Sequence, residues 1–363
     1  MNALMLAISE RARLSSSDIS TIQQQRPEIL IFLLACGFDP NERVSIGEGD
    51  WVAYSQGYPL WNFAALALRE IAEILLTRGA DPNVHVDSSG SSVHSAYSHK
   101  QWEMVDLLRR YGGEVTADTA AIYRESKLIG EMLSSGKADP PETLRFGAMG
   151  GHPESVRMAL ERIDWPRDDP RWFTIATEPL YFWHHIPWLY AGNKDLDRGT
   201  YLTCFLLILN RCGPNIRGSF GRTLLHEVAA MRDHITEDEA SAFAEALLNA
   251  GAKVGFRDDL LKSTALGWAC RWGRMRVARL MLEHGFDPVE SDAEPWATAR
   301  AWAKKRATRK WSNCWEDTAA DLSECATAPG RVGADYKAAN NVLPMDVWLG
   351  FERNDSIRAA CSN

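Results

Sequence analysis

The stretch EILLTRGADPN, residues 73–83, contains an apolar run that stops at a glycine followed by Asp-Pro-Asn. Close copies occur as IFLLACGFDPN at residues 31–41 and RLMLEHGFDP at residues 279–288. Apolar residues at this spacing predict the buried face of a helix. Glycine ends a helix readily because it adopts the left-handed conformation, and proline cannot continue one. Each copy therefore predicts a helix that exits into a turn, and the recurrence indicates an internal repeat.

The glycines that end these runs give the length of the repeat. Gly79 and Gly112 are 33 residues apart, and Gly251 and Gly285 are 34 apart. The segments TLLHEVAA at residues 223–230 and TALGWACRWG at residues 264–273 precede the runs that end at Gly251 and Gly285, the first of them with an insertion in between. The sequence resembles the ankyrin-repeat family, whose repeat of about 33 residues has a turn, two helices and a T-P-L-H-x-A motif.

The resemblance implies an all-α fold, an ankyrin-repeat solenoid of stacked helix-turn-helix repeats with irregular insertions. We expect the repeat domain to cover residues 1–310 in about eight repeats, several of them degenerate. Insertions are expected near residues 47–57, 186–202 and 231–243, where the period is interrupted. Residues 311–363 have no repeat register and are expected to form an irregular C-terminal tail.

Each position of the repeat motif has a predicted structural role. Threonine at the first position caps a helix, proline suits its first turn, glycine ends the second helix, and Asp-Pro-Asn turns the chain away. The histidines are expected to make structural hydrogen bonds, so a catalytic His226–Glu227 pair is disfavoured. Leu75 and Leu282 are expected to be buried in second helices. The motif residues are Pro59, Gly79, Asp81, His94, Gly112, Thr223, His226, Gly251, Thr264 and Gly285.

Composition restricts the partners and the compartment. The net charge of −8 gives no global attraction for nucleic acid or anionic lipid, and no apolar run is long enough to cross a membrane. The seven cysteines are scattered without a C-x-x-C pair, which is typical of reduced thiols. We therefore expect a cytoplasmic protein whose partner is an unknown protein, with neither nucleic acid nor membrane bound.

Aromatic residues concentrate around the second insertion, where residues 165–205 contain ten in 41 positions. Such a density either builds a local core or forms a recognition patch, and the sequence leaves both open. A projecting loop is expected because Pro, Gly, Asn and Asp occur within it. The candidate partner-binding residues are Trp183, His184, His185, Trp188, Tyr190, Asp195 and Asp197.

Catalytic chemistry has no support in the sequence. Adjacent histidines point in different directions on a helix, and no third ligand is spaced to join His184 and His185 at a metal. We expect no metal, no cofactor and no enzymatic activity. The resemblance implies instead a non-catalytic scaffold that binds a partner protein through its concave face and inserted loops. The alternative is an enzyme or small-ligand binder with a pocket around residues 181–202.

One basic run, RAWAKKRATRK at residues 300–310, departs from the acidic character of the chain. Its cations are expected to form the solvated face of a terminal helix, as the ends of a solenoid require for solubility. A localisation signal and a site for an anionic partner remain open alternatives.

Overall fold

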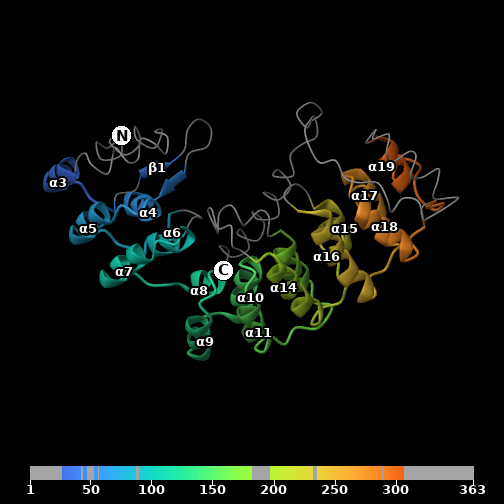
Figure 1. The fold of residues 1–363 in the computed structure, drawn as a ribbon, viewed down its shortest axis with the longest axis horizontal. Helices are drawn as coiled ribbons and strands as arrows, with labels where there is room; N and C mark the ends of the chain where they lie inside the picture. The colour runs from blue at the N-terminus through green and yellow to red at the C-terminus, as the bar shows by residue number, and fades with distance from the viewer. Residues whose placement is uncertain are drawn as a thin grey trace, which may run out of the picture. The chain divides into compact units, whose positions relative to one another are not determined.

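The computed structural model describes residues 27–41, 44–46, 53–55, 57–86, 90–181, 197–231, 235–287 and 289–305. The chain divides into two compact units, residues 1–311 and 312–363, and the second unit lies outside the described residues. The described part of the first unit is built almost entirely from short helices (Figure 1).

The helices and strands follow one another as α3 (Pro27–Ala35), β1 (Val44–Ile46), β2 (Ala53–Ser55), α4 (Tyr58–Ala65), α5 (Arg69–Thr77), α6 (Ser92–Ser98), α7 (Trp102–Arg110), α8 (Ala117–Ile122), α9 (Ser126–Ser134), α10 (Pro140–Met149), α11 (Pro153–Leu160), α12 (Arg171–Thr177), η2 (Glu178–Tyr181), α14 (Gly199–Leu209), η3 (Ser219–Gly221), α15 (Leu224–Ala230), α16 (Glu237–Asn249), α17 (Ala265–Trp272), α18 (Met275–Glu283) and α19 (Ala299–Lys305).

Most of these helices form pairs that stack on the next pair along the chain. The first helices pack on one another, as α4 does on α6 and as α15, α17 and α19 do in turn. The second helices form a parallel row, in which α5 packs on α7 and α16 on α18. The prediction of an all-α repeat fold is confirmed. The described residues add one antiparallel hairpin, in which Val44 pairs with Ser55, at the expected first insertion.

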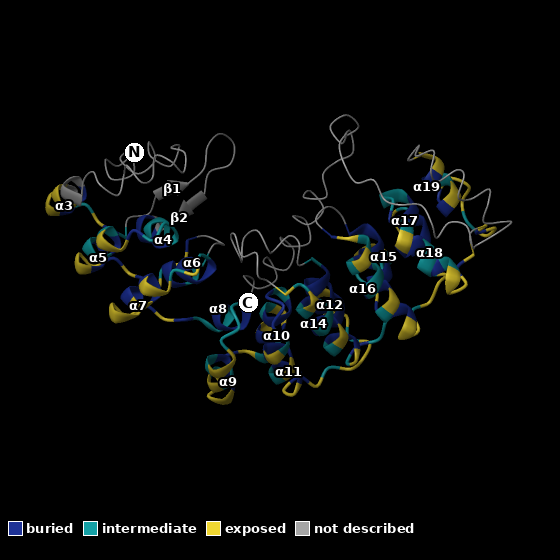
Figure 2. Ribbon diagram, viewed as in Figure 1, coloured by how far each residue is buried: buried dark blue, intermediate teal, exposed yellow. Residues whose placement is uncertain are grey.

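The second helices bury one side chain at the same position of several repeats. The residue four places before the terminal glycine is fully buried in four of them, Leu75, Leu108, Leu247 and Met281. Buried residues, dark blue in Figure 2, recur on these second helices. The expectation for Leu75 therefore agrees with the structure, whereas that for Leu282 is wrong by one position. Leu282 is only half-buried because Met281 takes the inward position of α18.

The same four helices end in one hydrogen-bond pattern. The terminal glycines Gly79, Gly112, Gly251 and Gly285 have φ between 83° and 89°, which is the left-handed region. The amide after Gly79 donates to the carbonyl of Leu75 (3.0 Å), and the Gly79 amide donates to Leu76 (3.1 Å). These two bonds are the Schellman pattern, which satisfies carbonyls that the helix itself leaves without a partner.

The asparagine of the Asp-Pro-Asn turn joins its own repeat to the next one. Asn41 donates from Nδ2 to the carbonyl of Gly79 (2.7 Å) and accepts at Oδ1 from the amide of Asp81 (2.7 Å). Asn83 makes the same pair of bonds to Gly112 (2.9 Å) and Glu114 (2.8 Å). Asn215, which stands in a Gly-Pro-Asn turn, makes the same pair of bonds to Gly251 and Lys253. Each asparagine thus fixes the helix exit of the following repeat.

Replacing Asn83 with alanine is expected to lower the free energy of unfolding by about 1–2 kcal/mol, because a carbonyl and an amide then lose their partner at the joint between two repeats. Urea titration of the variant measures this loss. Asn249→Ala is the matched control, since Asn249 is exposed at the end of α16. A loss for Asn83→Ala no greater than that for Asn249→Ala would contradict a coupling role.

Two of the expected insertions have different bounds from those predicted. Residues 237–243 are helical, because Thr236 Oγ1 accepts from the amide of Glu239 (3.1 Å) and the Glu239 carboxylate accepts from the amide of Thr236 (2.8 Å). This capping box starts α16 and lengthens the second helix. Residues 199–202 are also helical, since Asp197 Oδ1 accepts from the Gly199 amide (2.9 Å) at the start of α14.

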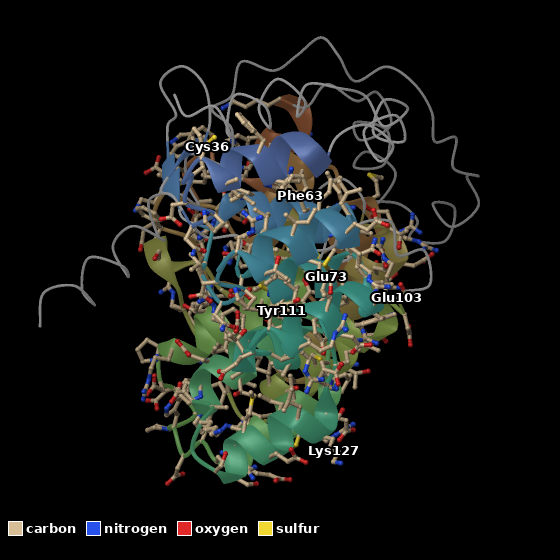
Figure 3. The ribbon with its side chains drawn as sticks, turned by 90° about the vertical axis from the view of Figure 1, so that its left-hand side faces the viewer. Cys36, Phe63, Glu73, Glu103, Tyr111 and Lys127 are labelled. Carbon is tan, nitrogen blue, oxygen red and sulfur yellow. The ribbon has the colours of Figure 1, made fainter. Side chains whose placement is uncertain are left out.

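Charged side chains follow one side of the second helices. Figure 3 shows Glu73, Glu103 and Lys127 along successive helices α5, α7 and α9. Glu103 accepts a hydrogen bond from Arg69 of the preceding pair (2.8 Å), and both side chains are well exposed to solvent. Such an exposed ion pair adds little stability, so the apolar stripe and the asparagine bonds account for the stacking.

Candidate protein-interaction surface

Three consecutive turns lead into the first helices α15, α17 and α19. These finger turns are residues 216–222, 256–263 and 289–298. The first two double back as small hairpins, with antiparallel bridges between Arg217 and Thr223 and between Arg257 and Thr264. Thr264 then caps α17 by accepting from the amide of Gly267 (3.3 Å). The hairpin and the cap together set where each turn ends and its helix begins.

The first two finger turns are bonded directly to each other. The amide of Asp259 donates to the carbonyl of Phe220 (2.7 Å), and Arg217 Nη2 donates to the carbonyl of Arg257 (2.8 Å). Within the second turn, the buried Asp258 carboxylate accepts from the amides of Leu260 (2.9 Å), Leu261 (2.6 Å) and Ser263 (3.2 Å). It also accepts from Trp268 Nε1 (2.9 Å), which ties the turn to α17.

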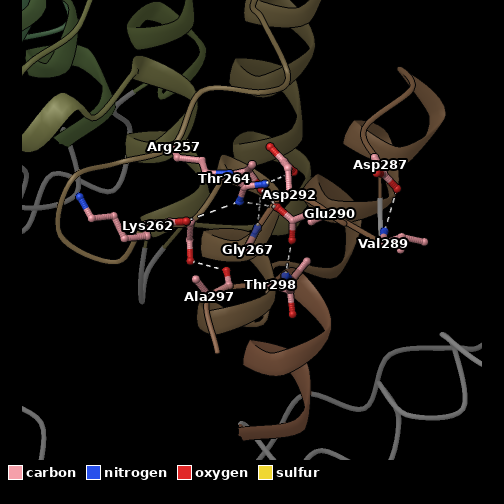
Figure 4. Close-up of polar contacts among 12 residues, drawn as sticks. Arg257, Lys262, Thr264, Gly267, Asp287, Val289, Glu290, Asp292, Ala297 and Thr298 are labelled. Carbon is pink, nitrogen blue, oxygen red and sulfur yellow. Dashed lines mark hydrogen bonds and ion pairs between the residues drawn. The ribbon is translucent and has the colours of Figure 1, made fainter. Parts of the chain in front are cut away.

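The third finger turn is held by a buried glutamate. Glu290 accepts from the Thr264 hydroxyl (2.7 Å) and from the amide of Ala299 at the start of α19, and Arg257 Nη1 lies 3.3 Å from the same carboxylate. Arg257 also reaches Asp292 (2.9 Å), as Figure 4 shows. A buried carboxylate is favourable only when donors compensate it, and here they come from three repeat elements. The finger turns therefore form one connected surface.

Each finger turn exposes at least one large apolar side chain, and the third turn exposes Val289 as well. Phe220, Leu260 and Trp296 are 46%, 43% and 44% exposed. Scattered apolar residues on a surface are ordinary, but three on adjacent, cross-bonded turns form a patch of the kind that binds proteins. None of these three residues is among the candidates predicted from the sequence. The sequence gives no clear signal for them, because the same turns contain other apolar residues, among them Ile216, Phe256 and Leu261.

Among the motif residues, Thr223 and His226 are brought together at the start of α15. His226 Nδ1 accepts from the amide of Thr223 (3.1 Å), and Nε2 donates to the carbonyl of Ser263 in the next repeat (3.2 Å). Both ring nitrogens are thus used by the neutral imidazole. Burial lowers the pKa of His226 to about 4 from its ordinary value of 6.5, against an opposing effect of the Ser263 bond.

Stability should depend on pH through this histidine. Its folded pKa is below the unfolded value, so its stabilising contribution is complete above about pH 6.5 and is lost as the pH falls towards about 4. We expect it to lower the free energy of unfolding by about 2 kcal/mol between about pH 7 and about pH 5. His226→Gln should lose that part of the dependence in urea titrations, while the exposed control His284→Gln should keep it. Equal pH slopes in the two variants would refute the assignment.

The other motif residues lie in several repeats. Pro59 is buried in the first turn of α4, and Asp81 Oδ1 accepts from the amide of Asn83 (2.8 Å). His94 Nδ1 lies 2.9 Å from the Thr119 hydroxyl of the following pair, and burial lowers the pKa of this histidine. These contacts join neighbouring repeats rather than assembling a single site.

Glu227 follows His226 and is buried. Its carboxylate lies 3.2 Å from Arg222 Nε and accepts a short hydrogen bond from the Tyr181 hydroxyl. Its charge is therefore compensated by an arginine and a phenol from two other parts of the chain. Tyr181 is the last described residue before the segment that contains the expected insertion, and Glu227 holds its hydroxyl.

Residues 182–196, which include most of the expected insertion at 186–202, lie outside the described residues, and so do Trp183, His184, His185, Trp188, Tyr190 and Asp195. The described residues that follow this segment are held by contacts as well. Arg198 makes a bidentate contact with Glu239, at 2.6 Å and 3.0 Å, and the Asp197 carboxylate accepts from the amide of Gly199 (2.9 Å) at the start of α14. Of the candidate partner-binding residues, Asp197 alone is described, and its role there is to start a helix.

The described residues give no sign of a metal centre or a membrane span. Within the ranges that the structure describes, no three His, Cys, Asp or Glu side chains come together as metal ligands. In the same ranges, no helix has the length and apolar composition that crossing a membrane requires.

Stacked helix pairs joined by bonded hairpin turns define an all-α repeat protein. Comparison with family models matches residues 196–292 to ankyrin repeats, in three copies. Residues 196–292 therefore contain ankyrin repeats, and the predicted resemblance is confirmed over that segment. No curated protein matches the sequence. The matched segment contains the first two finger turns and the start of the third.

Proposed function

We propose that this chain is a non-catalytic scaffold that binds a partner protein through its finger turns, the adjoining concave face of the first helices, and the aromatic insertion. Ankyrin repeats generally mediate protein–protein interaction, and proteins built from them are typically non-catalytic. We assign the surface that binds the partner mainly to the finger turns. Its main support is the row of Phe220, Leu260 and Trp296 on three cross-bonded turns.

The finger turns are held rigidly, and this favours binding. A partner gains most from apolar side chains that are already fixed, because little conformational entropy is then lost on binding. Asp258 and Glu290 hold the backbone of two of the turns, and the Phe220 carbonyl is bonded to the next turn. Aromatic residues at the centre of such a patch commonly contribute most of the binding energy.

The experiment that tests the proposal compares two triple variants of the full chain. Affinity capture followed by mass spectrometry identifies the partner of the unmodified protein, and calorimetry then measures its affinity. Phe220→Ala, Leu260→Ala and Trp296→Ala together should weaken binding at least about 30-fold, since each truncation at a patch centre costs about 1 kcal/mol or more. The melting temperature should change little.

The control combines Ile31→Ala, Phe32→Ala and Trp102→Ala, which remove three exposed apolar side chains elsewhere in the described structure. This variant should bind like the unmodified chain. Full affinity in the finger variant together with loss in the control would place the binding surface on the N-terminal repeats and overturn the assignment.

We also propose a cytoplasmic location. The support is the chemistry of the described cysteines, which are free thiols. Cys204 and Cys212 are buried, and burial raises the pKa of each thiol to about 12, which keeps it protonated and unreactive. Cell fractionation tests the location, and recovery of the chain in a secreted or membrane fraction would refute it.

A further inference from the structure

The first two finger turns carry more cations than their own carboxylates can neutralise. Residues 216–222 and 253–263 together contain five Lys and Arg residues and two Asp residues, in a chain whose net charge is −8. Two of the five, Arg222 and Arg257, are paired with buried glutamates. The three that remain are all exposed, and they are Arg217, Lys253 and Lys262.

Neither aspartate of these turns neutralises the three exposed cations. Asp258 is buried, and its carboxylate is committed to backbone amides and to an indole. Asp259 is exposed and lies near Arg217, since a Cβ on Gly221 would be 2.5 Å from Arg217 Nη2 and 2.8 Å from Asp259 Oδ2. Among the described residues, however, no carboxylate forms an ion pair with any of the three cations. The exposed surface of these turns is therefore positive.

Two of the cations lie beside one aromatic ring. Arg217 Cζ is 5.2 Å and Lys253 Nζ is 5.8 Å from the centroid of the Phe256 ring, so the two charges are at most about 11 Å apart. About three residues of an extended segment span that distance. Arg217 is also held by its bonds to the carbonyls of Gly221 (2.9 Å) and Arg257 (2.8 Å), so little side-chain entropy is lost when it binds a ligand.

The third cation, Lys262, occupies a position that favours glycine. Lys262 and Gly221 each lie two residues before the capping threonine of their turn, with φ of 50° and 65°. Glycine adopts this left-handed conformation without strain, whereas lysine does so at a cost. Such residues also occur between paired helices, as at Lys100, so the conformation alone marks no site. Here, however, the side chain is exposed close to Leu260, and Figure 4 shows that it extends away from Glu290.

We propose that Arg217, Lys253 and Lys262 bind carboxylates of an acidic segment of the partner protein, while apolar side chains of the same segment contact Phe220 and Leu260. Charge-assisted hydrogen bonds of this kind are stronger than neutral ones. Cations at the edge of an apolar patch also steer the segment and fix its position on the patch. The inference rests on the proposed function, because it names the chemistry of the partner that the finger turns bind.

The third finger turn favours an acidic protein segment over a long polyanion. Residues 289–298 contain three Asp and Glu residues and no Lys or Arg, and Asp292 and Glu294 are exposed. A nucleic acid that crossed all three turns would meet these carboxylates, whereas its binding depends on a continuous positive surface. A segment whose carboxylates are confined to the first two turns avoids that repulsion.

The test uses the full-length chain and fluorescein-labelled peptides of about twelve residues, with binding followed by fluorescence anisotropy. One peptide is built from Leu-Glu-Ser repeats, and its two matched partners replace every Glu with Gln or with Lys. At low salt the Glu peptide should bind at least about tenfold more tightly than the Gln peptide, and the Lys peptide should bind most weakly. The preference for Glu should shrink as the salt concentration rises.

Variants of the cations and of their neighbouring carboxylate should shift this preference in opposite directions. Lys253→Gln with Lys262→Gln should weaken binding of the Glu peptide at least about fivefold and leave the Gln peptide within about twofold. Lys262→Gly alone should weaken the Glu peptide without lowering the melting temperature, because glycine relieves the backbone strain. Asp259→Asn should strengthen binding of the Glu peptide about twofold or more, which a merely structural role of this surface would not produce.

The control is Lys127→Gln with Lys137→Gln, the same charge change at two exposed positions, one on α9 and one just beyond its end. It should bind the Glu peptide within about twofold of the unmodified chain. Equal affinity for the Glu and Gln peptides, equal losses in the two lysine pairs, or no binding of the Glu peptide would each overturn the proposal. Circular dichroism shows whether each variant is folded, and Lys262→Gly decides if the Lys253 and Lys262 pair is not.

The finger variant, with alanine at Phe220, Leu260 and Trp296, separates failure of this inference from failure of the proposed function. If it weakens the Glu and Gln peptides equally and the charge variants have no effect, the apolar patch stands and the carboxylate inference falls. If only the charge variants act, carboxylate binding stands and the apolar patch falls. Tighter binding of an oligothymidylate or of phosphatidylserine vesicles, with the same dependence on Lys253 and Lys262, would assign the cations to nucleic acid or membrane and overturn the inference.

Discussion

Leu75→Ala is expected to lower the free energy of unfolding by about 2–5 kcal/mol. Leu75 lies fully buried on α5, where the truncated side chain would leave a cavity between stacked helices that cannot close completely. Denaturant titration followed by circular dichroism measures the loss. Because each repeat contacts only its neighbours, part of the loss should appear as separate unfolding of the N-terminal pairs.

Leu282→Ala is the matched comparison, because it removes the same atoms at the half-buried position one residue further along the repeat. Its loss should be clearly smaller than that of Leu75→Ala, since less apolar surface is returned to water. Equal losses at the two sites would show that the position four residues before the glycine is not the buried one.

Asp258→Ala should cost about 3–5 kcal/mol, which is large for a residue in a turn. The substitution removes the acceptor of three backbone amides and of Trp268 Nε1, and it leaves these buried donors without partners. The second finger turn should lose its shape, and the bond between Asp259 and Phe220 should weaken with it. The melting temperature and the affinity for the partner should therefore fall together.

Asp259→Ala is the control for this prediction, because Asp259 is the exposed neighbour and contributes its backbone amide to the contact with Phe220. Its stability should remain within about 0.5 kcal/mol of the unmodified chain. If Asp258→Ala lowered the free energy of unfolding as little as Asp259→Ala, the Asp258 carboxylate would not be the group that holds the turn.

The parts of the fold that sequence predicts well are those fixed by local chemistry. Gly79, Gly112, Gly251 and Gly285 end helices because of their own backbone freedom and the hydrogen bonds of adjacent residues. The register error at Leu282 has a simple cause. Leu280, Met281 and Leu282 are all apolar, so the sequence of α18 does not say which of them points inward, and contact with α16 decides it.

The start of α16 carries a sequence signal that the prediction of an insertion at residues 231–243 did not take into account. Thr236 and Glu239 form the T-x-x-E signature of a capping box, but residues 231–243 were assigned to an insertion because the period was broken there. The exposed side chains of the finger turns are different. Whether Phe220 or Leu260 faces solvent depends on how one turn bonds to the next, which no local pattern contains.

Contacts between side chains that are far apart in the chain could not be predicted from the sequence either. Tyr181 and Glu227 are 46 residues apart, and Arg198 and Glu239 are 41 apart, so nothing local indicates these contacts on either side of residues 182–196. The same holds for Arg271 and Trp302, whose contact depends on the stacking of α19 on α17.

The central claim is that the finger turns of the ankyrin repeats bind the partner protein. Hydrogen–deuterium exchange of the full chain, with and without its captured partner, tests it most directly because each turn is observed separately. We expect binding to slow exchange in residues 216–222, 256–263 and 289–298. Protection confined to the second helices α16 and α18, with unchanged exchange in all three turns, would contradict the claim.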